Sequence, residues 1–260
     1  MTRSVEVARG RRVVANAAFS LGLLFAAFPA RAEDVRVAVA ANFAAPMKEI
    51  AAQFERETGN RVLVSVGSTG GLYAQLKNGA PFELLLSADE QTPKRLEDDG
   101  AASAGLRFTY AIGKLVLYSP EPGFVDDQGR VLRAGNYKHL AIANPKTAPY
   151  GAAAVEALRH LGIWDGVQAK LVQGESISQA FQFVASGNAE LGFVALSQID
   201  TPGHPARGSW WLVPENLYSP IRQDAILLKS GENQPAARAL FDYLRSEKVK
   251  RLIHAYGYNN

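Results

Sequence analysis

Two kinds of apolar pattern alternate along most of this chain. Short runs rich in valine, leucine and alanine, which are typical of buried strands, are separated by segments whose apolar residues recur at helical spacing. The clearest helical face is formed by Phe43, Met47, Ile50, Ala51 and Phe54. Asn42 precedes this face as a favoured N-cap, and Gly59 follows it as a favoured helix end. The alternation predicts an α/β fold.

The apolar runs predict where the strands lie. We expect strands over residues 35–41, 62–66, 84–89, 110–118, 140–143, 191–196 and 225–229. Helical spacing predicts a short helix over residues 72–77, an alanine-rich helix that ends near Gly162, and a helix that carries Ile177 and Val184. Residues 235–256 are expected to form one closing amphipathic helix.

The first 32 residues follow a different pattern. An arginine-rich segment precedes an apolar run over residues 13–29, which is too short and too broken to span a bilayer comfortably. The run ends in Ala30-Arg31-Ala32, a small-x-small cleavage signature. Residues 1–32 are therefore predicted to be a secretory signal peptide, which implies a periplasmic protein. A membrane anchor or a buried helix is the alternative interpretation.

Removing this segment changes how the charge is interpreted. The 260-residue chain has 28 basic and 25 acidic residues, a net charge of +3. Residues 1–32 hold five of the basic residues and one acid, so the remaining 228 residues have 23 basic and 24 acidic residues. The basic excess that would suggest a nucleic-acid partner belongs to the predicted leader. We therefore expect no nucleic-acid partner.

The mature length favours two lobes. A chain of 228 residues is long for one open sheet, but it suits two lobes of about 110 residues each. We expect lobe I to comprise residues 33–110 and 222–260, and lobe II to comprise residues 111–221. The strands expected over residues 110–118 and 225–229 are the natural crossing points between the lobes.

Catalytic motifs are absent from the sequence. The four histidines are far apart and do not form an HExxH motif, and there is no GxSxG or GxxxxGK motif. The chain has no cysteine, which excludes thiolate nucleophiles, cysteine-ligated zinc and iron–sulfur clusters. We expect a binding protein without a cofactor or a protein-ligated metal. A periplasmic hydrolase that uses scattered carboxylates or histidines is the alternative.

Four predicted helix starts carry small polar residues or glycine where a strand has just ended. They contain Asn42, the Ser68-Thr69 pair, Tyr150 and Ile177. Ligands of open α/β sheets bind at the carboxyl ends of strands, and helix N-termini offer unpaired N–H groups to anions. Plain helix capping is the alternative for each turn. None of the four turns has lysine or arginine at its tip, which favours an oxyanion held by neutral groups.

The same segments resemble a known family. Residues 40–43, 67–76, 78–82 and 87–90, followed by 108–117, 144–145, 148–151 and 191–196, are similar to the periplasmic molybdate-binding proteins of molybdate ABC transporters. The resemblance covers essentially the whole mature chain in order. It implies a type II periplasmic binding protein with two α/β lobes, a hinge of two strands and an interlobe cleft. It also implies a monomer that delivers molybdate, and tungstate, to a membrane permease with an ATPase partner.

The resemblance also implies roles for individual residues. Asn42 would contact the oxyanion through its side chain and backbone amide, and Ser68 or Thr69 would donate a hydroxyl and an amide. Tyr150 and Ile177 would each supply a backbone N–H. Many members of the family have serine where Asn42 stands, and some have tyrosine where Ala195 stands. Another tetrahedral oxyanion, such as sulfate or phosphate, is the alternative ligand.

Overall fold

The computed structural model describes residues 1, 2, 4 and 32–259. The chain divides into two units, Met1–Arg31 and Ala32–Asn260, and the helices and strands among the described residues belong to the second unit. The predicted signal peptide lies outside the described residues, except for residues 1, 2, 4 and 32, and it stays a prediction. Among the described helices, none combines the length and the apolar character that a membrane span requires.

One five-stranded sheet has the strand order β2-β1-β3-β12-β4. Strands β1, β2 and β3 run parallel, whereas β12 is antiparallel to both of its neighbours. The strands are β1 (Asp34–Ala40), β2 (Arg61–Gly67), β3 (Leu84–Leu86), β4 (Ala102–Gly113) and β12 (Ile221–Leu228). The helices that belong to this sheet are η1 (Ala41–Phe43), α1 (Ala44–Thr58), α2 (Thr69–Lys77), α3 (Gln91–Asp98), η4 (Lys229–Gly231), α9 (Pro235–Tyr243) and α10 (Glu247–Ala255). We call this assembly lobe I.

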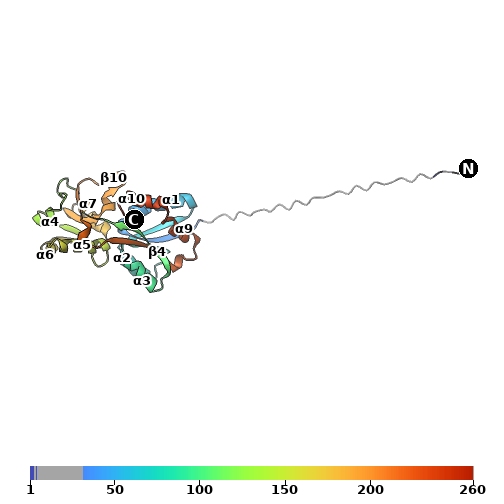
Figure 1. Cartoon of the computed structure of the whole chain (residues 1–260), viewed down its shortest axis with the longest axis horizontal. Helices are drawn as coiled ribbons and strands as arrows, with labels where there is room; N and C mark the ends of the chain where they lie inside the picture. Colours follow the sequence, from blue (N-terminus) through green and yellow to red (C-terminus); the bar gives the residue numbers. More distant parts are fainter. Residues whose placement is uncertain (3, 5–31, 260) are drawn as a thin grey trace. The chain divides into compact units, whose positions relative to one another are not determined.

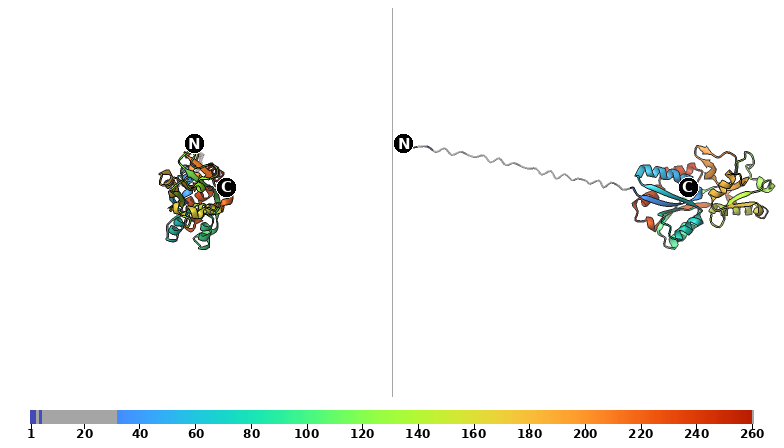
Figure 2. Two further views of the ribbon diagram at one scale, coloured as in Figure 1. Left: turned by 90° about the vertical axis from the view of Figure 1, so that its left-hand side faces the viewer. Right: turned by 180° about the vertical axis from the view of Figure 1, so that it is seen from behind.

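A second five-stranded sheet has the order β11-β5-β8-β6-β7 and is also mixed. Its strands are β5 (Leu115–Ser119), β6 (Leu140–Ala143), β7 (Leu171–Gly174), β8 (Leu191–Ala195) and β11 (Ser209–Leu212). Its helices are α4 (Val131–Ala134), α5 (Pro149–His160), α6 (Trp164–Val167), η2 (Gln168–Lys170), α7 (Ile177–Ala185), α8 (Leu196–Ile199) and η3 (Glu215–Leu217), and a small hairpin joins β9 (Asp200–Thr201) to β10 (His204–Pro205). We call this assembly lobe II. Figures 1 and 2 show the two lobes as separate groups of helices around their own sheets.

Each sheet of the fold is packed against helices. In lobe I, Phe43 and Met47 pack with Val37 and Leu84 in one cluster on one face of the sheet. Residues from α2 and α3 pack with β3 and β12 in a second cluster. The central strands of both sheets are buried along their whole length, as expected for strands covered on both faces. The expected α/β fold with two lobes is confirmed.

Two expected elements are divided in the structure. The strand expected over residues 110–118 is wrong, because β4 and β5 belong to different sheets and the chain passes between them at Lys114. The helix expected over residues 235–256 is also wrong, because α9 ends at Tyr243 and Ser246 caps the separate helix α10. The chain returns to lobe I between β11 and β12. The exact lobe boundaries at 110/111 and 221/222 stay predictions.

Candidate functional site

The register of the parallel strands brings the expected helix starts together in pairs. In lobe I, Ala40 pairs with Gly67, so η1 and α2 begin from neighbouring strand ends. In lobe II, Ala143 pairs with Gly174, so α5 and α7 also begin from neighbouring strand ends. The N-termini of all four helices therefore lie at the carboxyl ends of the strands, where ligands of open α/β sheets bind.

One small cavity is lined by all five residues that the sequence predicts for the ligand site, Asn42, Ser68, Thr69, Tyr150 and Ile177. The other lining residues are alanine, glycine and proline, so none of the described residues around the cavity carries a charge. The cavity has a volume of about 10 Å³. The closed lobes therefore leave only a small space between these five residues.

Two hydroxyl groups stand at the start of α2. Ser68 is the N-cap, and its Oγ accepts a hydrogen bond from the Gly71 N–H at 3.3 Å. Thr69 is 2% exposed, and its Oγ1 accepts a hydrogen bond from the Ala88 N–H at 3.0 Å. A hydroxyl that accepts a hydrogen bond still has its own hydrogen to donate. Both residues can therefore donate to a ligand in the cavity.

Asn42 is held differently from what the resemblance implies. The two N–H groups of its side chain donate to Gln223 Oε1 at 2.7 Å and to Tyr258 Oη at 2.9 Å. The backbone N–H of Asn42 lies in the first turn of η1, where N–H groups have no helical partner. We therefore expect Asn42 to offer its backbone N–H to a ligand, while its side chain supports the wall of the cavity.

Tyr150 and Ile177 supply the lobe II side of the cavity. Tyr150 lies in the first turn of α5, which has no side-chain cap, and Ile177 is the first residue of α7. Their N–H groups are among those that a first helical turn leaves unpaired, and a helix N-terminus carries a partial positive charge. The Tyr150 hydroxyl accepts a hydrogen bond from Gln223 Nε2 at 3.3 Å. This assigns the hydroxyl to a neighbouring buried network and leaves the backbone N–H for the cavity.

That buried network contains four residues that the sequence analysis missed, Gln223, Tyr110, Tyr258 and Ser197. Gln223 Oε1 accepts hydrogen bonds from Asn42 Nδ2 and from Tyr110 Oη at 3.1 Å. The hydroxyls of Tyr258 and Ser197 both donate to the Asn42 carbonyl oxygen, at 2.9 and 3.0 Å. One signal was present in the sequence: Gln223 and Asp224 are two polar residues that directly precede an apolar run.

Hydrogen bonds join the two lobes around the cavity. The Gly70 N–H donates to the Thr147 carbonyl oxygen at 2.8 Å, and Ser178 Oγ donates to the Ala41 carbonyl oxygen at 3.2 Å. The contact from Ser197 to Asn42 also runs from lobe II to lobe I. The lobes are therefore closed on each other over the candidate site.

The small cavity adjoins a larger cleft of about 500 Å³. The two spaces share Ala88, Ala148 and Pro149 in their walls. Three acidic and three basic side chains line the larger cleft: Asp89, Glu90, Glu156, Arg95, Lys146 and Arg222. Their formal charges balance, so the cleft does not concentrate charge of one sign beside the cavity.

Burial raises the pKa of the tyrosines in this network, and the raised pKa of Tyr258 predicts how the stability of the protein depends on pH. Burial raises the pKa of Tyr258 to about 12, whereas an unfolded chain releases this proton near pH 10. Between these values the unfolded chain binds fewer protons at Tyr258, so this one tyrosine lowers the free energy of unfolding by about 3 kcal/mol as the pH rises. Urea titrations from pH 9 to 12 would measure the fall. The fall is expected to be smaller in Tyr258→Phe, and equal falls in the two proteins would contradict this assignment.

Comparison with known proteins decides the class of the chain. The family model of the bacterial extracellular solute-binding proteins matches residues 35–259. The chain belongs to this family. Membership confirms the expected class, a solute-binding protein, over the hydrolase alternative. It also agrees with an expected location outside the cytoplasm.

Individual members of the family give a finer comparison. The chain is 60% identical over 239 residues to the molybdate-binding protein ModA of Azotobacter vinelandii, covering 92% of this chain and 95% of the relative. It is 51% identical over 233 residues to ModA of Rhodobacter capsulatus, covering 89% and 90% of the two chains. The solved structure of the Azotobacter vinelandii periplasmic molybdate-binding protein superposes with a TM-score of 0.84 at 44% identity, and the match covers 87% of this chain and 99% of that one.

Proposed function

We propose that this chain is the periplasmic molybdate-binding protein of an ABC transporter and that it also binds tungstate. The observation that carries the proposal is the meeting of four helix N-termini from two lobes on one uncharged cavity. The similarity to two molybdate-binding proteins supports molybdate as the ligand. The anion is the cargo, and the proposal needs no cofactor and no direct bond from the protein to the metal.

Neutral donors are sufficient to hold such a dianion. The proposed contacts are the N–H groups of Asn42, Thr69, Tyr150 and Ile177 and the hydroxyls of Ser68 and Thr69. Hydrogen bonds to a charged group contribute about 1.5–3 kcal/mol each, so six donors give about 9–18 kcal/mol before the costs of association and closure. A full counter-charge is therefore unnecessary.

Two properties of the proposed site would set its selectivity. Sulfate is also a tetrahedral dianion that accepts hydrogen bonds, so only the size of the cavity separates it from molybdate. At neutral pH every phosphate ion carries at least one proton. A cavity lined by donors leaves that proton without an acceptor, which penalises phosphate.

Titration calorimetry with molybdate, tungstate, sulfate and phosphate tests the assignment. Molybdate and tungstate are expected to bind tightly, and the other two anions are expected to bind roughly 10- to 200-fold more weakly, as for other small differences in ligand size and hydrogen bonding. A preference for sulfate would replace molybdate with sulfate as the ligand. Absence of binding for all four anions would overturn the oxyanion proposal.

Transport follows from closure of the lobes. We propose that the bound anion favours the closed arrangement, because its contacts come from both lobes, and that a membrane permease with an ATPase subunit recognises this arrangement. One chain supplies the whole site, so a monomer is sufficient. The predicted signal peptide and the match to an extracellular family support a periplasmic location.

A further inference from the structure

Two neighbouring polar residues of β12, Gln223 and Asp224, are both buried, with 0% and 1% of their surfaces exposed. Successive side chains of a strand point to opposite faces of a sheet. Gln223 contacts the network beside the anion cavity. Asp224 is therefore directed to the other face, away from this network. Its burial is not explained by contact with the ligand.

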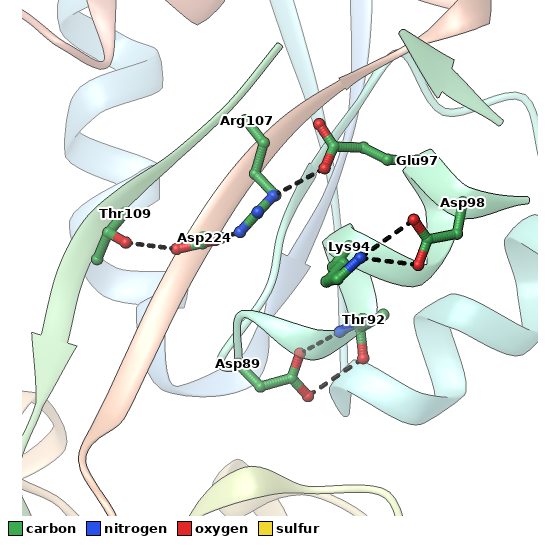
Figure 3. Close-up of polar contacts among 8 residues, drawn as sticks. All are labelled: Asp89, Thr92, Lys94, Glu97, Asp98, Arg107, Thr109 and Asp224. Carbon is green, nitrogen blue, oxygen red and sulfur yellow. Dashed lines mark hydrogen bonds and ion pairs between the residues drawn. The ribbon is translucent and has the colours of Figure 1, made fainter. Parts of the chain in front are cut away.

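Asp224 is held by charged and polar partners on that face. Arg107 of β4 forms an ion pair with Asp224, and the Thr109 hydroxyl donates to Asp224 Oδ1 at 2.7 Å. Figure 3 shows Arg107 between Glu97 and Asp224, with Thr109 approaching the same carboxylate from β4. The side chain of Asp224 is only 2% exposed, and a buried charge without a partner is strongly destabilising. These partners therefore fix where residue 224 can lie.

The pairing of β12 with β4 is irregular at this point. Gln223 pairs with Ala111 and Asp224 pairs with Thr109, so Tyr110 is an extra residue on β4. A β-bulge of this kind redirects side chains, and a slip of one residue would move Gln223 to the opposite face. The ion pair of Asp224 opposes such a slip, because the slip would bury its charge without Arg107.

Two sets of hydrogen bonds connect this bulge with the anion cavity. Gln223 contacts Asn42 of lobe I and Tyr150 of lobe II through opposite ends of its amide. The backbone carbonyl of Asp224 accepts from the Ser87 N–H at 2.9 Å, and the next residue, Ala88, donates to Thr69 Oγ1. Residue 224 thus supports the lobe I wall directly, and its neighbour Gln223 connects it to Tyr150 of lobe II.

We propose that the Asp224–Arg107 ion pair is a register lock, which holds Gln223 and the Ser87-Ala88 segment in place and thereby sets the affinity of the anion site. Asp224, Arg107 and Gln223 are positioning residues in this proposal, since none of them lines the cavity. The lock rests on the proposed function, because its effect is measured as oxyanion affinity.

The direct test is Asp224→Asn, which keeps the shape of the side chain and removes its charge. We expect molybdate to bind about five- to tenfold more weakly, a coupling of the size found along other contact networks. Calorimetry would measure the affinity at a temperature where unfolding curves show each protein to be folded. Thr109→Val removes only one hydrogen bond to Asp224. It is expected to weaken binding about twofold, and it provides the test if Asp224→Asn does not fold.

Glu83→Gln is the matched control. Glu83 is a buried acid of lobe I that pairs with Arg36 at 3.3 Å and precedes β3, whereas Ser87 follows β3 at its other end. The control is expected to lower stability and leave molybdate affinity unchanged. Wild-type affinity in both Asp224→Asn and Thr109→Val would overturn the lock alone. Failure of the wild-type protein to bind molybdate would instead overturn the proposed function.

A double-mutant cycle tests whether the lock acts through Gln223. Gln223→Met removes the polar amide at similar size. If Asp224 acts mainly by placing that amide, Asp224→Asn should weaken binding less in the Gln223→Met background than in the wild type. Equal fold-changes in the two backgrounds would show that Asp224 does not act through Gln223, and would overturn this part of the proposal.

Discussion

Replacing Thr69 with valine is expected to weaken molybdate binding by roughly 10- to 100-fold. Valine keeps the shape of threonine but lacks the hydroxyl, and a hydrogen bond to a charged group contributes about 1.5–3 kcal/mol. The change also leaves the Ala88 N–H without its acceptor, so a loss of about 1–3 kcal/mol in the free energy of unfolding is expected. Calorimetry with molybdate and urea unfolding without the anion would separate the two effects.

Two variants serve as controls for Thr69→Val. Thr69→Ser retains the hydroxyl and should keep affinity close to that of the wild type. Thr58→Val removes a hydroxyl that donates to the Phe54 carbonyl oxygen at 2.8 Å, in the last turn of α1, and should not change affinity. If Thr69→Val bound molybdate as tightly as the wild type, Thr69 would not be a ligand of the anion.

Replacing Gly70 with valine is expected to weaken binding about tenfold by opposing closure. An ideal Cβ on Gly70 would lie 3.0 Å from the Thr147 Cα, across the interface between the lobes. The backbone at Gly70 does not need glycine for its dihedral angles, so lobe I itself should accept valine. If the closed arrangement is less populated, the apparent affinity falls in proportion. Calorimetry would measure the affinity, and small-angle scattering would measure whether molybdate still compacts the protein.

Gly166→Val is the control for this closure effect. A Cβ on Gly166 would meet no atom within 4 Å, so the extra side chain should affect neither closure nor affinity. The free energy of unfolding of anion-free Gly70→Val is expected to match that of the wild type. A large loss of stability in that variant would show that the valine disturbs lobe I rather than the contact between lobes.

Local patterns were sufficient to predict strands β1, β2, β3, β6 and β8 and helices α1, α2, α5 and α7, whereas α3, β7 and β11 were not predicted. The run Leu84 to Leu86 is buried strand β3, and Gly59 ends α1 in a left-handed conformation with φ 76°. The division at Lys114 was missed because residues on both sides are apolar, and apolar character does not reveal to which sheet a strand belongs. The start of α10 was missed although Ser246 is a favourable N-cap, because the apolar spacing continues across it.

The sequence by itself determined the class of the fold, the four helix starts and the neutral chemistry of the candidate site. These properties depend on the periodicity of side chains and on capping, which act over a few residues. Only the tertiary structure decided that Asn42 and Tyr150 share Gln223, and that Asp224 is buried against Arg107. These contacts join residues far apart in the chain, and the strand register that creates them depends on the packing of whole sheets.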